Sequence, residues 1–201
     1  MTSVFRQQIS RVFRRPREQP HAPRELADVD VMLLPRPVAV AYAARCAREV
    51  LPLFGSSWPG ASPKVVEGLE HTLCVIEAPE EYVIDDEIAR RSVMFLDQVV
   101  TSSTHAPAAS RAARVIQATY SATHASQVRE LAPATHELVM HAVRFTDEAV
   151  RCCNRPDDEK QQIVAALCDD FFRLHAFANS REIEDSDACS VRMLRRWGVL
   201  E

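Results

Sequence analysis

Glycine is scarce in this chain of 201 residues, which contains only four. Sheets whose strands are joined by tight turns usually need more glycine, because those turns place residues at positive φ. Hydrophobic residues make up 47% of the chain and charged residues 26%, a balance typical of globular proteins. The length suits one domain with a single core. We therefore expect an all-α, single-domain bundle or array of about six main helices.

The motifs of common catalytic sites are also missing. The sequence contains no Gly-x-Ser-x-Gly elbow, no phosphate-binding loop and no dinucleotide-binding glycine fingerprint. With so few glycines, a loop that cradles phosphate through its backbone N–H groups is difficult to build. We expect no catalytic residues and no cofactor, and hence no enzyme.

Metal-binding patterns are weak. Glu67, His71 and Cys74 lie four and three residues apart, which would place three possible ligands on one helix face. Zinc sites usually take spaced pairs of ligands from two segments, so a histidine held by a structural hydrogen bond is the better interpretation. The only Glu-x-x-His, from Glu18 to His21, lies in a proline-rich stretch, whereas a di-iron bundle needs two such motifs on facing helices. We expect no metal site.

Long apolar runs and paired cysteines are absent as well. No stretch approaches the roughly 20 apolar residues of a membrane span, and no signal-peptide core stands near the start. The six cysteines form no C-x-x-C pair, which favours a reduced, cytoplasmic protein with packed thiols. Cys152 and Cys153 are adjacent, and adjacent side chains on a helix diverge by about 100°, so we expect two packing thiols.

Charge is present but unevenly distributed. The net charge of −4 gives no electrostatic reason to expect nucleic-acid binding. Residues 1–60 carry nine Lys or Arg against five Asp or Glu, whereas residues 64–100 carry three against nine. Three interpretations remain open: solvated helix faces, complementary faces within the fold, or a surface that docks a partner of opposite sign.

The first 36 residues differ from the rest of the chain in charge and proline content. Phe5, Ile9 and Val12 follow helical spacing among five arginines that precede the first acid, and prolines then interrupt the chain. The sequence predicts a basic amphipathic segment and linker over 1–36 and an all-helical domain over 37–201. The amphipathic segment could pack on the acidic middle of the chain or contact a membrane surface.

The strongest helical pattern begins at Pro37. The apolar stripe of this helix is formed by Val38, Tyr42, Cys46, Val50 and Leu53. Pro52 lacks a backbone donor, so we expect it to kink or end this helix near Leu51.

Further helices follow between prolines. Ser62-Pro63 predicts a helix through about Ala78, and Glu80 and Glu81 are expected to begin the next one. That next helix should bury one face, formed by Ile84, Ile88, Phe95 and Val99. The sixth main helix, after residues 157–159, carries two adjacent apolar stripes and is therefore expected to be central.

The stretch 42–67 also carries a recognisable order of residues. Arg45 precedes Cys46-Ala47, Val50-Leu51 and Phe54 follow, and a proline-containing loop leads to the next helix at Pro63. This order resembles the first strong helix of the helical immunity proteins of bacterial polymorphic-toxin systems. The alanine-rich helices downstream are similar in texture.

The resemblance implies a cytoplasmic protein of a bacterial conflict system that neutralises a toxin or effector by covering it, without catalytic residues. The charge asymmetry suggests where such a partner would bind, because an acidic surface suits a basic, nuclease-type toxin. The candidate partner-binding residues are Glu67, Glu70, Glu77, Glu80, Glu81, Asp85, Asp86 and Glu87. The alternative is a helical adaptor or regulatory module, with a homo-oligomer formed through the wide face of the sixth helix.

Overall fold

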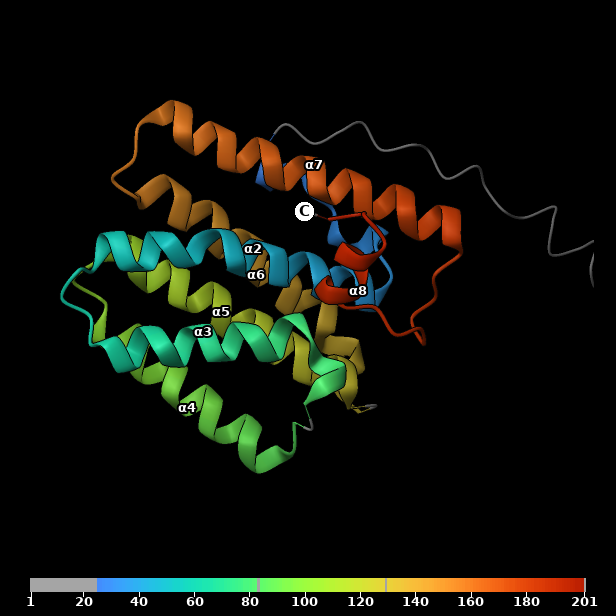
Figure 1. The fold of residues 1–201 in the computed structure, drawn as a ribbon, viewed down its shortest axis with the longest axis horizontal. Coiled ribbons are helices and arrows are strands. Elements are labelled where there is room, and N and C mark those ends of the chain that lie inside the picture. The colour runs from blue at the N-terminus through green and yellow to red at the C-terminus, as the bar shows by residue number, and fades with distance from the viewer. Residues whose placement is uncertain (1–24, 83, 129, 201) are drawn as a thin grey trace, which may run out of the picture.

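The computed structural model describes residues 25–82, 84–128 and 130–200, and within them the fold is all-α (Figure 1). The α-helices of these ranges are α2 (Arg36–Ser57), α3 (Pro63–Glu77), α4 (Asp86–Ser102), α5 (Pro107–Gln127), α6 (Thr135–Cys152), α7 (Asp157–Arg181) and α8 (Val191–Arg196). Short 3₁₀ helices are η1 (Leu26–Asp28), η2 (Val31–Leu33), η3 (Pro79–Glu81) and η4 (Ala132–Ala134). Six long helices and the short α8 confirm the predicted fold class. The predicted amphipathic segment at residues 1–24 lies outside the described residues.

The chain just before α2 contributes to the core. Leu26, Val31 and Leu34 are buried around the turns η1 and η2, and the carbonyl of Leu34 lies 2.9 Å from His136 Nε2 on α6. The core therefore extends into the part of residues 1–36 that the sequence predicts as linker.

Helix α2 is almost entirely surrounded by other helices. Its predicted stripe from Val38 to Leu53 is buried, and Pro37 stands in the first turn, where a missing N–H costs nothing. The expected end near Leu51 is wrong, because α2 continues through Pro52 to Ser57. Pro52 is solvent-exposed, so water can hydrogen-bond to the backbone carbonyl that its ring leaves without a donor.

The predicted boundaries of α3 are close to those observed, but α4 begins later than expected. Glu80 and Glu81 belong to η3, and the cap of α4 is Asp85, whose side chain accepts a 2.7 Å hydrogen bond from the Ile88 amide. The buried face of α4 consists of Ala89, Leu96, Val99 and Val100. The prediction that Ile88 is buried is wrong, because the adjacent Ala89 takes the buried position in the first turn of α4 and Ile88 is exposed.

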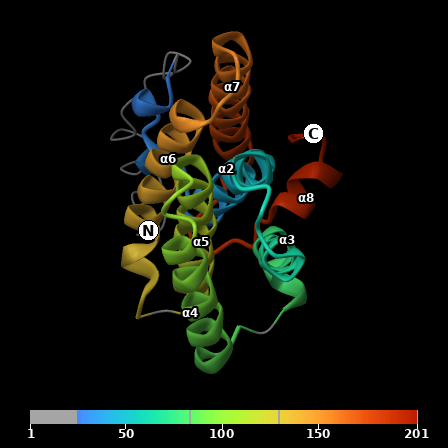
Figure 2. The same cartoon turned by 90° about the vertical axis from the view of Figure 1, so that its left-hand side faces the viewer.

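The central helix is α5, not the sixth main helix α7. Helix α5 packs against α2, α3, α4 and α6, and its many buried alanines let these neighbours approach closely. Helix α7 lies at one edge, against α2 and α6 (Figure 2). Its second stripe is not fully covered, since Phe172 is exposed and Val164 only half-buried. None of the helices in the described ranges has the length and apolar character needed to cross a membrane.

Candidate partner-binding surface

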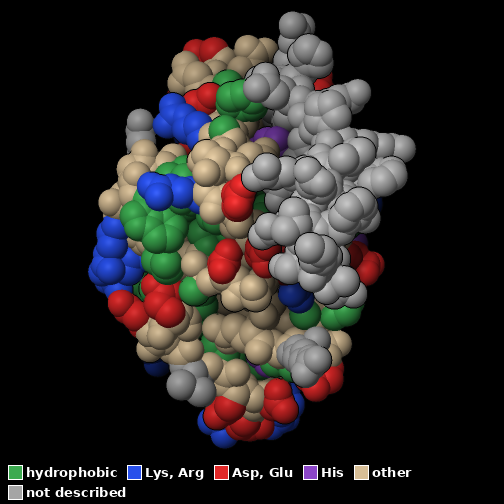
Figure 3. Space-filling model, turned by 90° about the vertical axis from the view of Figure 1, so that its right-hand side faces the viewer, with side chains coloured by type: hydrophobic (Ala, Val, Ile, Leu, Met, Phe, Trp, Pro, Cys, Tyr) green, Lys and Arg blue, Asp and Glu red, His purple; other side chains and the backbone are tan. Residues whose placement is uncertain are grey.

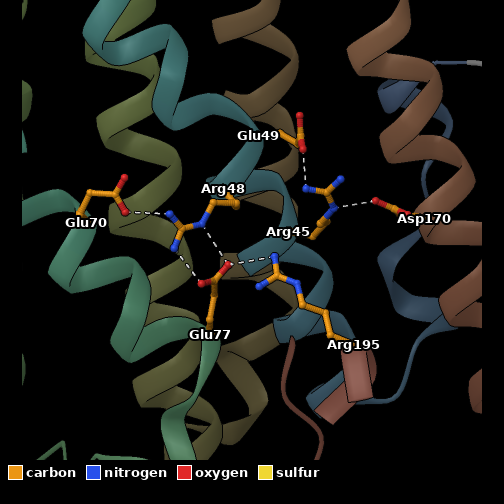
Figure 4. Close-up of polar contacts among 7 residues, drawn as sticks. All are labelled: Arg45, Arg48, Glu49, Glu70, Glu77, Asp170 and Arg195. Carbon is orange, nitrogen blue, oxygen red and sulfur yellow. Dashed lines mark hydrogen bonds and ion pairs between the residues drawn. The ribbon is translucent and has the colours of Figure 1, made fainter. Parts of the chain in front are cut away.

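Two of the eight candidate acids are held inside a charge network between helices (Figure 4). Arg48 of α2 donates to Glu70 Oε2 at 2.7 Å and, through two nitrogens, to both oxygens of Glu77 at 2.7 and 3.1 Å. Arg195 of α8 lies 3.6 Å from the same Glu77 carboxylate, whose side chain is only 13% exposed. The hydrogen bonds that Arg48 donates to Glu77 raise the pKa of Arg48 above its ordinary value, against the effect of burial. Glu70 and Glu77 therefore join α2, α3 and α8.

A second pair joins α2 to α7. Arg45 Nε donates to Asp170 Oδ2 at 2.8 Å, and its Nη1 also donates to Glu49 one turn along α2. Burial raises the pKa of Asp170, an effect that outweighs the attraction of the Arg45 guanidinium. The adjacent Asp169 is exposed and pairs with Arg173, as expected for two consecutive acids on one helix.

Two further candidate acids, both in η3, hold the start of α8. The hydroxyl of Ser190, the N-cap of α8, donates to Glu80 Oε1 at 2.9 Å. Arg192 donates to Glu81 across the same junction. With Asp85 capping α4, five of the eight candidates have structural partners. We call Glu70, Glu77, Glu80, Glu81 and Asp85 the structural acids.

The remaining three, Glu67, Asp86 and Glu87, face solvent, and we call them the outward acids. Glu67 is exposed on α3. The Asp86 side chain is 99% exposed and lies 3.7 Å from His124 Nε2. Glu87 pairs with Arg90 and Arg91 of its own helix. Acidic and basic side chains thus lie next to one another where α4 begins, at the foot of Figure 3.

Two apolar side chains in this region, Tyr82 and Ile88, are exposed. The periodicity of the sequence does not identify them as exposed. Tyr82, between η3 and α4, is exposed, and its ring lies 6.5 Å from that of His71 on α3. His71 is one turn from Glu67. Ile88 is exposed in the first turn of α4, next to Asp86 and Glu87. The end of the molecule formed by α3, η3 and α4 therefore presents both apolar and acidic groups.

The predicted ligand and thiol sites can also be placed. Glu67, His71 and Cys74 are all exposed on α3, and no group of three potential metal ligands occurs in the described ranges. Cys152 is exposed whereas Cys153 is buried, so the side chains of the vicinal pair diverge as predicted, but the expectation of two packing thiols is wrong for Cys152. Burial raises the pKa of Cys46 to about 12, which keeps this thiol protonated and unreactive at neutral pH.

Comparison with family models, with curated proteins and with solved structures finds no significant match to this chain. The structure itself shows an all-α protein. Its charge networks hold the helices together, and the exposed surface of α3, η3 and α4 is the candidate site.

Proposed function

We propose that this chain is a non-catalytic binding protein that acts like a bacterial immunity protein, covering a toxin or effector through the end formed by α3, η3 and α4. One observation carries the proposal: the outward acids Asp86 and Glu87 directly precede the exposed Ile88, and the exposed Tyr82 lies against His71, one turn from Glu67 on α3. Interface cores are enriched in aromatic side chains and surrounded by a polar rim. The resemblance over residues 42–67 supports the same class.

The chemistry of the surface selects a partner with a basic face. Each carboxylate without a positively charged partner inside the protein attracts a positively charged surface and increases the rate at which a partner that carries such a surface is met. Glu70, Glu77 and Glu81 contribute less to this attraction, because neighbouring arginines of α2 and α8 already compensate their charge. The same holds for Glu87, which pairs with two arginines of α4, so Glu67 and Asp86 carry most of the attraction. We place the protein in the cytoplasm, where a toxin partner would be met.

An alternative is a self-associating adaptor or regulatory module. Helix α7 lies at an edge of the molecule and exposes Phe172 on its outer side, with the exposed Ala165 and Ala176 near it in helical spacing. Two copies could bury this small apolar strip against each other. This interface would use α7 and would leave the outward acids in solvent.

Affinity purification of the tagged full chain from its own cells, with mass spectrometry of what is recovered, separates the two proposals. The binding proposal predicts one stoichiometric partner that carries a toxin-like domain with a basic surface. Recovery of the chain alone, as a defined oligomer, would contradict it and favour the adaptor. A toxin gene immediately adjacent to the gene for this chain would agree with the first outcome.

A further inference from the structure

A pocket of about 360 Å³ lies between the end of α7, the loop that follows it and the residue after α8. It is lined by Phe177, Arg181, Ile183, Asp187, Ala188 and Trp197. Small-molecule sites in proteins usually occupy about 300–1,000 Å³ and combine apolar or aromatic walls with a few polar groups. The volume and the lining of this pocket are both of that kind.

Two helix ends build the pocket, joined by the loop that runs from α7 to α8 (Figure 1). Glu182 adopts a φ of 52° and closes α7, and the Ile183 amide donates to the Ala178 carbonyl at 3.0 Å. Gly198, with a φ of 68°, ends α8 in the same way. These two ends bring Ile183 and Trp197, which are distant in the chain, to one site.

One wall of the pocket is aromatic. The ring of Trp197 lies 5.6 Å from the ring of Phe177, with an angle of 32° between the ring planes. Trp197 is nevertheless 49% exposed, so its indole can contact a further ring, and such ring pairs stabilise beyond the area that they bury. Since a cavity of about 150 Å³ holds one benzene ring, the pocket has room for a ring and the atoms attached to it.

Two side chains of opposite charge line the same pocket. Arg181 is the last residue of α7, and Asp187 lies in the loop; both are exposed. The turn of the loop orients Asp187, because its Oδ2 accepts a 2.7 Å hydrogen bond from the Glu184 amide. A ligand with charge of one sign would be attracted by one of the two side chains and repelled by the other. A ligand with an ammonium and a carboxylate group would be attracted by both.

We propose that this pocket binds a free amino acid with an aromatic side chain, for which L-phenylalanine is the probe. The ring would lie against Trp197, the carboxylate would accept hydrogen bonds from the Arg181 guanidinium, and the ammonium group would donate to the Asp187 carboxylate. The site does not depend on the proposed toxin-binding function, because its lining contains none of the outward acids.

Calorimetric titration of the full chain tests the proposal with three matched ligands. These are L-phenylalanine, 3-phenylpropanoate, which lacks the ammonium group, and 2-phenylethylamine, which lacks the carboxylate. We expect L-phenylalanine to bind with a dissociation constant of at most about 1 mM, and each of the others to bind about 3- to 10-fold more weakly.

Two variants assign the charged groups. Arg181→Gln should weaken L-phenylalanine binding by about 3- to 10-fold without weakening that of 2-phenylethylamine. Asp187→Asn can still accept the hydrogen bond from the Glu184 amide, and it should weaken L-phenylalanine binding without weakening that of 3-phenylpropanoate. Both positions are exposed, so we expect both variants to fold.

Tryptophan fluorescence locates the ligand. The other tryptophan of the chain, Trp58, packs against Phe54 and His105, outside the pocket. L-Phenylalanine should change the emission of the wild type, whereas Trp197→Phe, which keeps an aromatic wall, should bind it without that change. Two outcomes would overturn the proposal: no binding of L-phenylalanine up to about 10 mM, or equal affinity for L-phenylalanine and 3-phenylpropanoate.

Discussion

At the residue scale, Arg48 joins α2 to α3 through three hydrogen bonds. Its guanidinium binds two carboxylates of α3, and the more buried of them, Glu77, also faces Arg195 of α8. A planar guanidinium can bind a carboxylate through two parallel hydrogen bonds, which a lysine cannot do. The geometry at Glu77 therefore depends on arginine at position 48.

Removal of this arginine should cost stability. Arg48→Ala leaves Glu77 poorly paired in a mostly buried position, so we expect the free energy of unfolding to fall by about 2–3 kcal/mol in urea titrations. Arg90→Ala is the matched control, since Arg90 is exposed and pairs only within α4; it should change stability by less than about 0.5 kcal/mol. Equal effects of the two variants would contradict a structural role for the Arg48 network.

The buried thiol of Cys46 makes stability depend on pH. Burial raises its pKa from 9.0 in the unfolded chain to about 12 in the fold. Between these values the unfolded thiol loses its proton while the folded thiol keeps it, so the folded state binds more protons and stability falls as pH rises. At pH 8 the protonated Cys46 thiol still makes its full contribution to the free energy of unfolding. By about pH 10 that free energy has fallen by about 1 kcal/mol.

Cys46→Ala removes this contribution and allows it to be measured. The stability difference between wild type and Cys46→Ala should be smaller at pH 10 than at pH 8, by about 1 kcal/mol, in denaturant titrations. Cys152→Ala, at the exposed neighbour of Cys153, is the control, and its effect should be the same at both values. A Cys46→Ala difference that does not change with pH would refute the account of this thiol.

Single residues also show what the sequence could and could not reveal about the site. The cluster of acids over 67–87 and the Arg45–Glu49 spacing are visible in the sequence. The division into structural and outward acids is not, because it depends on arginines of α2 and α8 that are distant in the chain. The exposure of Ile88 was not predictable either, because it depends on which face of α4 packs on the other helices, and that face contains the adjacent Ala89.

At the scale of elements, the contact between α3 and α4 depends on a glycine. A Cβ atom at Gly68 of α3 would stand 2.5 Å from Cζ of Phe95 on α4, far inside van der Waals contact. The absence of a side chain at position 68 therefore lets the Phe95 ring pack directly on the α3 backbone. Gly55 of α2 has no atom within 4 Å of the corresponding position.

The two glycines give a matched pair of substitutions. Gly55→Ala should stabilise the protein by up to about 1 kcal/mol, because alanine is the better helix former. Gly68→Ala should destabilise it by about 1–2 kcal/mol, since the clash with Phe95 outweighs that gain. Thermal or urea unfolding of both variants is the measurement, and stabilisation by Gly68→Ala would show that α3 and α4 do not pack as described.

Helix identity was more predictable than helix position. Apolar periodicity and first-turn prolines identify α2, α3 and α5, because local spacing decides which residues form a helix. The course of α2 through Pro52 was not predictable, since it depends on the exposure of that turn. The central place of α5 was also missed, because alanines pack tightly without contributing a strong hydrophobic stripe.

At the scale of the whole molecule, many charged side chains pair with one another across helices. Arginines of α2 and α8 compensate three of the structural acids, Glu70, Glu77 and Glu81, so the acidic middle of the sequence is partly a complementary face within the fold. The interpretation of complementary faces within the fold therefore applies to these structural acids, whereas the outward acids lie in solvent. The structural acids hold helices together, and the outward acids are those proposed to meet a partner.

The most direct test reverses two of the outward acids, Glu67 and Asp86. We would compare recovery of the partner by the tagged wild-type chain and by Glu67→Lys/Asp86→Lys, with Asp158→Lys/Glu184→Lys as a control of equal charge change at exposed acids elsewhere. The account predicts that the first variant loses the partner while its stability stays within about 0.5 kcal/mol of wild type, and that the control retains both. Undiminished recovery of the partner by Glu67→Lys/Asp86→Lys would contradict the proposed surface.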